Sequence, residues 1–289
     1  MSSPELLQAG DWFEIALRET GLPPNPAILA ELRREVAQEE KDSARIIDLL
    51  SADVAIAIAL IRSANDRFAP AERTGETIHD ALAMLGLESI INALNSRHLD
   101  WAFGHSSLER FWDRSARNAR LSAWIAERVP GRPLPPSQAY TFGLLRNIGI
   151  PLLMAPFPEY RHVLARANQD AGEFIAIEDD SLGLNHAVIG AELLQHWLED
   201  PQFCLAVRRH HDLGFLRRND SANARPRCLI AVSTLASHWL SAKAAVDSDA
   251  EWEKLGPACL EIMGWTEDDI VPLRAQAGAL LAREGRTSP

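Results

Sequence analysis

Three histidines stand in segments whose residue types could bind a metal ion. His186 lies in Asn185-His-Ala-Val-Ile-Gly-Ala191, and His210 and His211 are adjacent in Arg209-His-His-Asp212. A neutral imidazole offers a nitrogen lone pair that zinc readily accepts. Neighbouring residues on a helix point about 100° apart, so at most one of His210 and His211 should face a given site directly. Taken one at a time, each of the three is typical of a core or helix-end histidine.

The elements that must position these histidines are helices. Residues 53–64 alternate in a way that could suggest a strand, but their small alanines and the lack of turn residues favour a buried helix. Asn185 is a suitable N-cap, and Asp200 followed by Pro201 is a well-matched helix start. The sequence predicts an all-α fold, with helices over 26–37, 44–50, 53–64, 77–85, 87–98, 108–129, 137–145, 158–170, 173–179, 185–198, 201–211, 226–243, 251–263 and 267–283.

Composition excludes several classes of function. The formal net charge is −11, from 29 basic and 40 acidic residues. Nucleic-acid binding needs clustered Lys and Arg for phosphate contacts, so we expect no nucleic-acid partner. The longest apolar run, residues 54–61, is too short to cross a bilayer, so we expect no membrane segment.

The cysteines and the N-terminus indicate a cytoplasmic location. Cys204, Cys228 and Cys259 are odd in number, widely spaced and without a CxxC pair, which is typical of reduced thiols. The first residues lack the basic and apolar regions of a secretory signal.

Six segments in order make the chain similar to the HDOD family, the output-domain relatives of the HD phosphohydrolases. The segments cover most of the chain, and each is weak alone. They are residues 21–26, 51–65, 77–86, 111–115, 143–149, and 185–191 together with 210–211. The resemblance implies an HD-domain-like helical bundle with an N-terminal helical subdomain. We therefore divide the chain into a lead-in (1–20), the N-terminal helical part (21–104), the HD-like core (105–245) and C-terminal helices (246–289).

At the positions where the catalytic relatives have their metal ligands, the resemblance places residues that are not typical metal ligands. Their early His falls on Arg114, their consecutive His-Asp pair on Arg146 and Asn147, and their later Asp near Ser233. Arginine cannot lose a proton to coordinate a metal, and two arginines bring positive charge where a dication would bind. The resemblance thus implies a degenerate HD site, with no catalytic residue and no cofactor.

Other uses of the same residues stay open. His186, His210 and His211 match positions that bind a second metal in some two-metal relatives, so they could retain a divalent metal or line a pocket. Arg114 and Arg146 could bind an anion, or form ion pairs with Glu178 or Asp179.

These observations favour a non-catalytic bacterial regulatory module that acts through protein partners in a signalling system. One alternative is a divergent metal-dependent phosphohydrolase that uses the three histidines. Another is a sensor of a nucleotide or anion. The apolar stripes after Glu251 could pack on the core or form a homodimer, and packing on the core is the simpler expectation.

Overall fold

The computed structural model consists of α-helices and one short 3-10 helix over the residues that it describes. These residues are 22, 24–67, 76–94, 108–131, 133–154, 156–169, 174–195, 198, 200–218, 220–241 and 249–284. No strand occurs among them, which confirms the predicted all-α class. The chain divides into two compact units: Met1–Ala116 with Leu194–Asp200, and Arg117–Leu193 with Pro201–Pro289. The functional boundaries expected at 21, 105 and 246 stay predictions.

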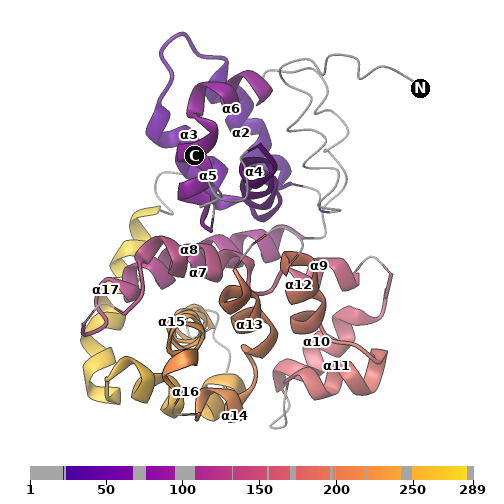
Figure 1. Ribbon diagram of the computed structural model, residues 1–289, viewed down its shortest axis with the longest axis vertical. Helices are drawn as coiled ribbons and strands as arrows, with labels where there is room; N and C mark the ends of the chain where they lie inside the picture. The colour runs from indigo at the N-terminus through magenta and orange to yellow at the C-terminus, as the bar shows by residue number, and fades with distance from the viewer. Residues whose placement is uncertain are drawn as a thin grey trace. The chain divides into compact units, whose positions relative to one another are not determined.

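The first unit is a cluster of short helices around α4 (Figure 1). Helix α4 contacts α3 and α5, while α2 contacts α3 and α6. Every residue from Val54 to Ile61 is buried, so this helix is apolar on all sides, which explains its strand-like pattern. The helices are α2 (Pro26–Val36), α3 (Ser43–Ala52), α4 (Val54–Arg67), α5 (Ile78–Leu85) and α6 (Leu87–Leu94).

A buried carboxylate holds the start of α4. Asp53 is fully buried, and its Oδ1 accepts the backbone N–H of Ile56 at 2.8 Å. Its Oδ2 accepts the N–H of Asn25 at 2.6 Å, which ties α4 to the start of α2. Burial raises the pKa of Asp53 to about 6, although the backbone N–H groups oppose the shift.

The second unit surrounds the long helix α15 (Figure 1). All residues of α15 from Cys228 to Ala236 are buried, and the helix packs against α16, α13, α8 and η2. The helices of this unit are α8 (Pro136–Leu145), α9 (Gly149–Met154), α10 (Tyr160–Gln169), α11 (Phe174–Leu182), α12 (His186–Gln195), α13 (Pro201–Arg209), α14 (Leu213–Leu216), η2 (Ser221–Asn223), α15 (Ala224–Ser241), α16 (Ala250–Met263) and α17 (Glu267–Glu284). Helix α7 (Glu109–Ala126) and the last turn of α12 contain the divisions between the two units.

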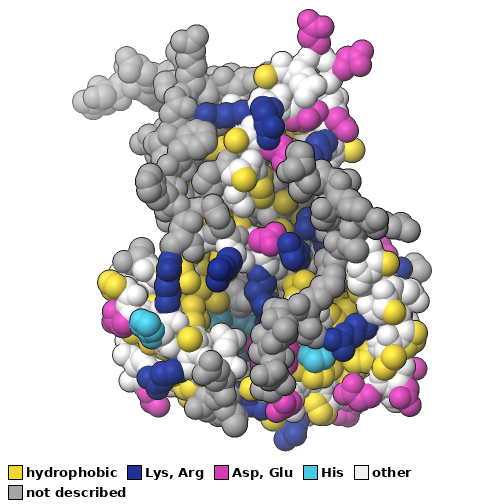
Figure 2. All heavy atoms as spheres, turned by 180° about the vertical axis from the view of Figure 1, so that it is seen from behind, with side chains coloured by type: hydrophobic (Ala, Val, Ile, Leu, Met, Phe, Trp, Pro, Cys, Tyr) yellow, Lys and Arg dark blue, Asp and Glu magenta, His cyan; other side chains and the backbone are white. Residues whose placement is uncertain are grey.

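Three short elements were not predicted: α9, α14 and η2. Each has six residues or fewer, so none shows the repeated apolar spacing by which longer helices are found. None of the described helices combines the length and the apolar character that crossing a bilayer requires. On the face that Figure 2 shows, acidic and basic side chains are interspersed among hydrophobic ones.

Candidate functional site

The turn before α12 fixes the position of His186. Gly183 has a φ of 73°, a left-handed conformation that allows the chain to reverse after α11. Asn185 Oδ1 accepts the backbone N–H of Val188 at 2.9 Å, so the predicted N-cap is confirmed. His186 follows as the first helical residue, and its side chain is fully buried.

A close approach between two backbones holds this helix start in place. A Cβ added at Gly149, the first residue of α9, would lie 2.0 Å from the carbonyl oxygen of His186. A Cβ at Gly190 would lie 3.0 Å from Ile148 Cγ2 and 3.2 Å from the nitrogen of Gly149. Glycine at 149 therefore allows α9 and α12 to meet at the histidine.

Glu178 of α11 orients the ring of His186. Its Oε2 lies 2.7 Å from His186 Nδ1 and also accepts the backbone N–H of His186 at 3.0 Å. The hydroxyl of Tyr160 on α10 donates to Glu178 Oε1 at 2.5 Å. Burial alone would raise the pKa of Glu178, but hydrogen bonds and charge from His186 lower it overall. An ionised carboxylate only accepts hydrogen bonds, so His186 carries its proton on Nδ1.

His210 and His211 are oriented in a similar way by groups at their Nδ1 atoms. His210 Nδ1 lies 2.6 Å from the carbonyl oxygen of Val207, which can only accept a proton. His211 Nδ1 forms an ion-pair contact of 2.5 Å with Glu251 Oε1 on α16. In all three histidines, the Nδ1 atom is thus engaged and the Nε2 atom is directed elsewhere.

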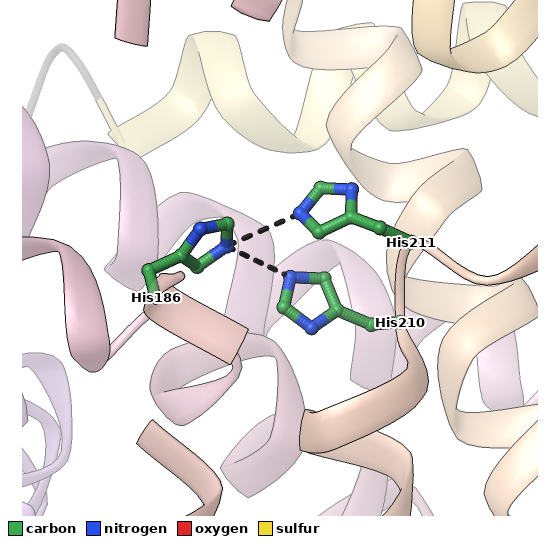
Figure 3. Close-up of side chains that lie close together, drawn as sticks. All are labelled: His186, His210 and His211. Carbon is green, nitrogen blue, oxygen red and sulfur yellow. Dashed lines mark hydrogen bonds between the residues drawn. The ribbon is translucent and has the colours of Figure 1, made fainter. Parts of the chain in front are cut away.

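The three Nε2 atoms converge on one point (Figure 3). His186 Nε2 lies 3.3 Å from His210 Nε2 and 3.1 Å from His211 Nε2. All three side chains are buried, and their candidate ligand atoms lie within 4.8 Å of one another. His210 Nε2 is also 3.1 Å from Asn147 Oδ1, in the turn after α8. We call His186, His210 and His211 the histidine cluster.

Burial disfavours the protonation of His210 and His211. It lowers the pKa of His210 well below the usual value, and the charges of His211, Arg146 and His186 act in the same direction. Burial also lowers the pKa of His211, although Glu251 opposes that shift. Glu251 stays ionised: burial alone would raise its pKa, but His211 and Arg146 lower it to about 2. The neutral form of an imidazole is the one that binds a metal ion.

A small cavity of about 70 Å³ borders the cluster. His211 and Glu251 form one part of its lining, and Phe174 stacks on His211 with ring centroids 4.6 Å apart. The remaining lining residues are Leu213, Lys254 and Leu255. This volume suits water molecules or a small ion rather than a nucleotide.

A second buried polar group lies at Arg146. Its guanidinium donates to Ser233 Oγ at 3.1 Å, and the Ser233 hydroxyl donates to Asn118 Oδ1 at 2.9 Å. The Asn118 amide donates in turn to the Ser233 carbonyl oxygen and to Ser237 Oγ. We call Arg146, Ser233 and Asn118 the arginine network; it joins α7 and α15 to the end of α8.

The arginine network does not fit the metal of the catalytic HD relatives. Its members at the predicted ligand positions are a guanidinium and a hydroxyl, and Arg146 is only 3% exposed. A buried guanidinium offers no lone pair and repels a dication. We therefore derive no catalytic step through a metal at this position.

The two arginines lie in different surroundings. Arg114 is exposed on α7, and the residue of that helix that bonds to Ser233 is Asn118, one turn further along. The pairing of an arginine with Glu178 or Asp179 stays a prediction. Glu178 holds His186 and Tyr160, and Asp179 Oδ1 accepts the amide of Asn185.

Sequence reasoning missed the groups that orient the histidines. Glu178, Tyr160 and Glu251 come from three helices that are separate from those of the histidines. A signal for Glu178 exists, because this carboxylate follows Phe174-Ile-Ala-Ile177 in an apolar helix. An acidic residue among such neighbours is typically buried with a partner.

Comparisons with known proteins agree with the fold. The HDOD domain family model matches residues 22–213. An uncharacterized protein of Treponema pallidum is 27% identical over 203 residues; the match covers 69% of this chain and 39% of that protein. The chain thus spans about two fifths of the length of this relative.

Two crystal structures share the fold. A fragment of the MmoQ response regulator of Methylococcus capsulatus has a TM-score of 0.61 and 22% identity, with 83% of this chain and 90% of that chain covered. A virulence factor of Campylobacter jejuni has a TM-score of 0.59 and 19% identity, with 89% and 96% covered.

Proposed function

The chain belongs to the HDOD family, and we propose that it is a non-catalytic signalling module that acts through contacts with partner proteins in the cytoplasm. The arginine network carries the proposal. Two of the four positions to which the resemblance assigns the metal ligands, Arg146 and Ser233, belong to this network, as a buried guanidinium and a hydroxyl that bond to each other. Hydrolysis of a phosphoester by a metal-bound water needs a dication there, and these groups would oppose one.

The similar proteins support a regulatory role at the level of the family. One of the two similar folds is a response regulator by name. At 22% identity, this similarity establishes the fold only, so the partner contacts of this chain are part of the proposal.

The competing function is a metal-dependent phosphohydrolase that uses the histidine cluster, and the cluster itself is the observation in its favour. The purified full-length chain should be assayed for phosphodiesterase and nucleotidase activity with added manganese or zinc. We expect no turnover above that of the metal alone. Hydrolysis that is lost in His210→Ala but kept in His162→Gln, an exposed histidine on α10, would establish the enzyme instead.

The positive test is a defined complex. A partner captured by crosslinking in the native cells should be purified and mixed with the chain, and binding should be measured by calorimetry. We expect saturable binding at a fixed stoichiometry that is the same with and without nucleotides. Failure of every captured protein to bind in purified form would remove the protein-contact role. A thermal shift with a nucleotide would favour a ligand sensor.

A further inference from the structure

We propose that His186, His210 and His211 bind a zinc ion through their Nε2 atoms. The site lies beside the arginine network but shares no ligand with it. The inference goes beyond the signalling role, because zinc here would join helices and perform no hydrolysis.

The first argument concerns lone pairs. The proton of His186 is on Nδ1, where it meets Glu178, and the proton of His210 is on Nδ1, where it meets Val207. The Nε2 atoms of both rings then carry lone pairs, and they lie 3.3 Å apart. His211, whose Nδ1 contacts Glu251, directs a third Nε2 to within 3.1 Å of His186 Nε2. Lone pairs at these distances repel one another unless a cation lies between them.

The second argument concerns distance. Zinc binds imidazole nitrogen at about 2.0–2.1 Å in a tetrahedral arrangement, which places two ligand nitrogens about 3.3 Å apart. The two measured Nε2–Nε2 distances are 3.3 and 3.1 Å. Two of the three Nε2–Nε2 spacings in the cluster therefore match those of zinc ligands.

The third argument concerns the groups behind the ligands. Metal-binding histidines usually donate their other N–H to a carboxylate or a backbone carbonyl, which fixes the ring and increases its basicity. Glu178 and Glu251 provide carboxylates for two rings, and Val207 provides a carbonyl for the third. His186 and His210 are thus supported by hydrogen bonds of the kind that metal ligands make, and His211 by an ion-pair contact with a carboxylate.

Asn147 completes the donor set. Its Oδ1 lies 3.1 Å from His210 Nε2, and both atoms are acceptors when His210 carries its proton on Nδ1. A cation between them turns this repulsive contact into shared coordination. Three nitrogens and one amide oxygen form a neutral, four-coordinate set that suits zinc. The small cavity adjoins this set at His211.

A proton is the competing cation. A proton on His186 Nε2 would bond well to only one of the two neighbouring Nε2 atoms, whereas zinc engages all three lone pairs. Protein that holds a proton at this point contains no zinc, whereas protein that holds the metal does, so measuring the zinc content separates the two cases.

The test uses the full-length chain without a histidine tag, loaded with zinc and dialysed. We expect about one zinc per chain by elemental analysis, and X-ray absorption should show nitrogen and oxygen neighbours with several imidazoles. His210→Ala should lose the stoichiometric zinc. His162→Gln, which changes an exposed histidine on α10, should keep it.

Two further variants test the zinc site if His210→Ala does not fold. One changes the carboxylate that contacts the His186 ring, and the other changes the proposed fourth ligand. Glu178→Gln retains hydrogen-bonding capacity at the His186 ring but removes the charge, and it should weaken zinc binding by roughly 10- to 100-fold. Asn147→Asp adds a negative ligand and should tighten binding. Wild-type protein without bound zinc after loading would overturn the proposal, as would sulfur neighbours from a cysteine or equal zinc content in wild type and His210→Ala. None of these results would affect the proposed absence of hydrolysis.

Discussion

The histidine cluster and the arginine network are two buried polar sites of one helical unit. They differ in the charge and the hydrogen-bonding character of the groups at their centres. In the cluster, three lone pairs face one another and negative groups stand behind two of the rings. In the network, a guanidinium supplies the positive charge itself and is held by Ser233, which bonds to Asn118. One site is arranged to receive a cation, and the other contains one. Loss of catalytic ligands in this fold therefore need not remove every arrangement suited to a metal.

The largest expected effect comes from removing the histidine that faces Glu178. His186→Ala leaves a fully buried carboxylate with Tyr160 as its remaining side-chain partner. Breaking one partner from a buried ion pair costs about 3–5 kcal/mol. Urea unfolding should show this loss in the free energy of unfolding. The exposed control His162→Ala should stay within about 0.5 kcal/mol of wild type. Equal stability of the two variants would contradict the contrast between the sites.

Asp53 in the first unit is a buried carboxylate that can be compared with Glu178. Backbone N–H groups, rather than a histidine, bond to its side chain. Its pKa is raised from 3.8 to about 6, so the folded state keeps a proton that the unfolded chain releases. Its stabilising contribution is complete below about pH 4 and is lost as the pH rises to about 6, which amounts to at most about 3 kcal/mol.

The measurement is the difference in unfolding free energy between Asp53→Asn and wild type. This difference should move in favour of the variant as the pH rises from 4 to 7, because Asn mimics the protonated acid. Asp48→Asn, at an exposed position on α3, is the control. A difference that is constant with pH would show that the backbone N–H groups fully offset burial, and a difference that moves against the variant as the pH rises would show that they outweigh it.

Arg146→Met tests the arginine network. Removal of the hydrogen bond to Ser233 should cost roughly 2–3 kcal/mol, the value for a bond from a charged donor. Zinc content should be unchanged, since the arginine is not a ligand. Arg114→Met, at the exposed position on α7, should change stability by less than about 0.5 kcal/mol. Loss of zinc in Arg146→Met would show that the two sites depend on each other.

Tyr160→Phe has the smallest expected effect. It removes one hydrogen bond to Glu178, which keeps its contacts with the ring and the backbone of His186. The expected loss is about 1.5 kcal/mol in thermal or urea unfolding. A loss as large as that of His186→Ala would mean that Tyr160, and not the histidine, is the main partner of the carboxylate.

Local signals in the sequence were enough for most helix boundaries. The N-cap at Asn185 is confirmed by its bond to Val188, and the helix start at Asp200-Pro201 by α13. The helix predicted over 77–85 is confirmed as α5, with Thr77 as its cap and Gly86 at its end. These features depend on residues within one turn of each other, so their chemistry can be read along the chain.

The candidate site was predictable in part. His186, His210 and His211 were named as a group through the family resemblance, and the structure brings their Nε2 atoms together. Arg146 and Ser233 were named as well, and they are bonded to each other. Asn118, which joins them from α7, was not named. Its contacts with Ser233 and Ser237 cross between helices that are more than 100 residues apart in the sequence, so local residue patterns could not reveal them.

By itself, the sequence determined the all-α class and the family, because residue type and order carry these properties; the degenerate HD site that the resemblance implies stays a prediction. Only the tertiary structure decided what the three histidines face. The direction of each Nε2 depends on Glu178, Val207 and Glu251, and Glu178 and Glu251 lie on other helices than the histidines that they contact. Contacts between different helices leave no periodic trace in a sequence, and here they bring three separate imidazoles together at one site.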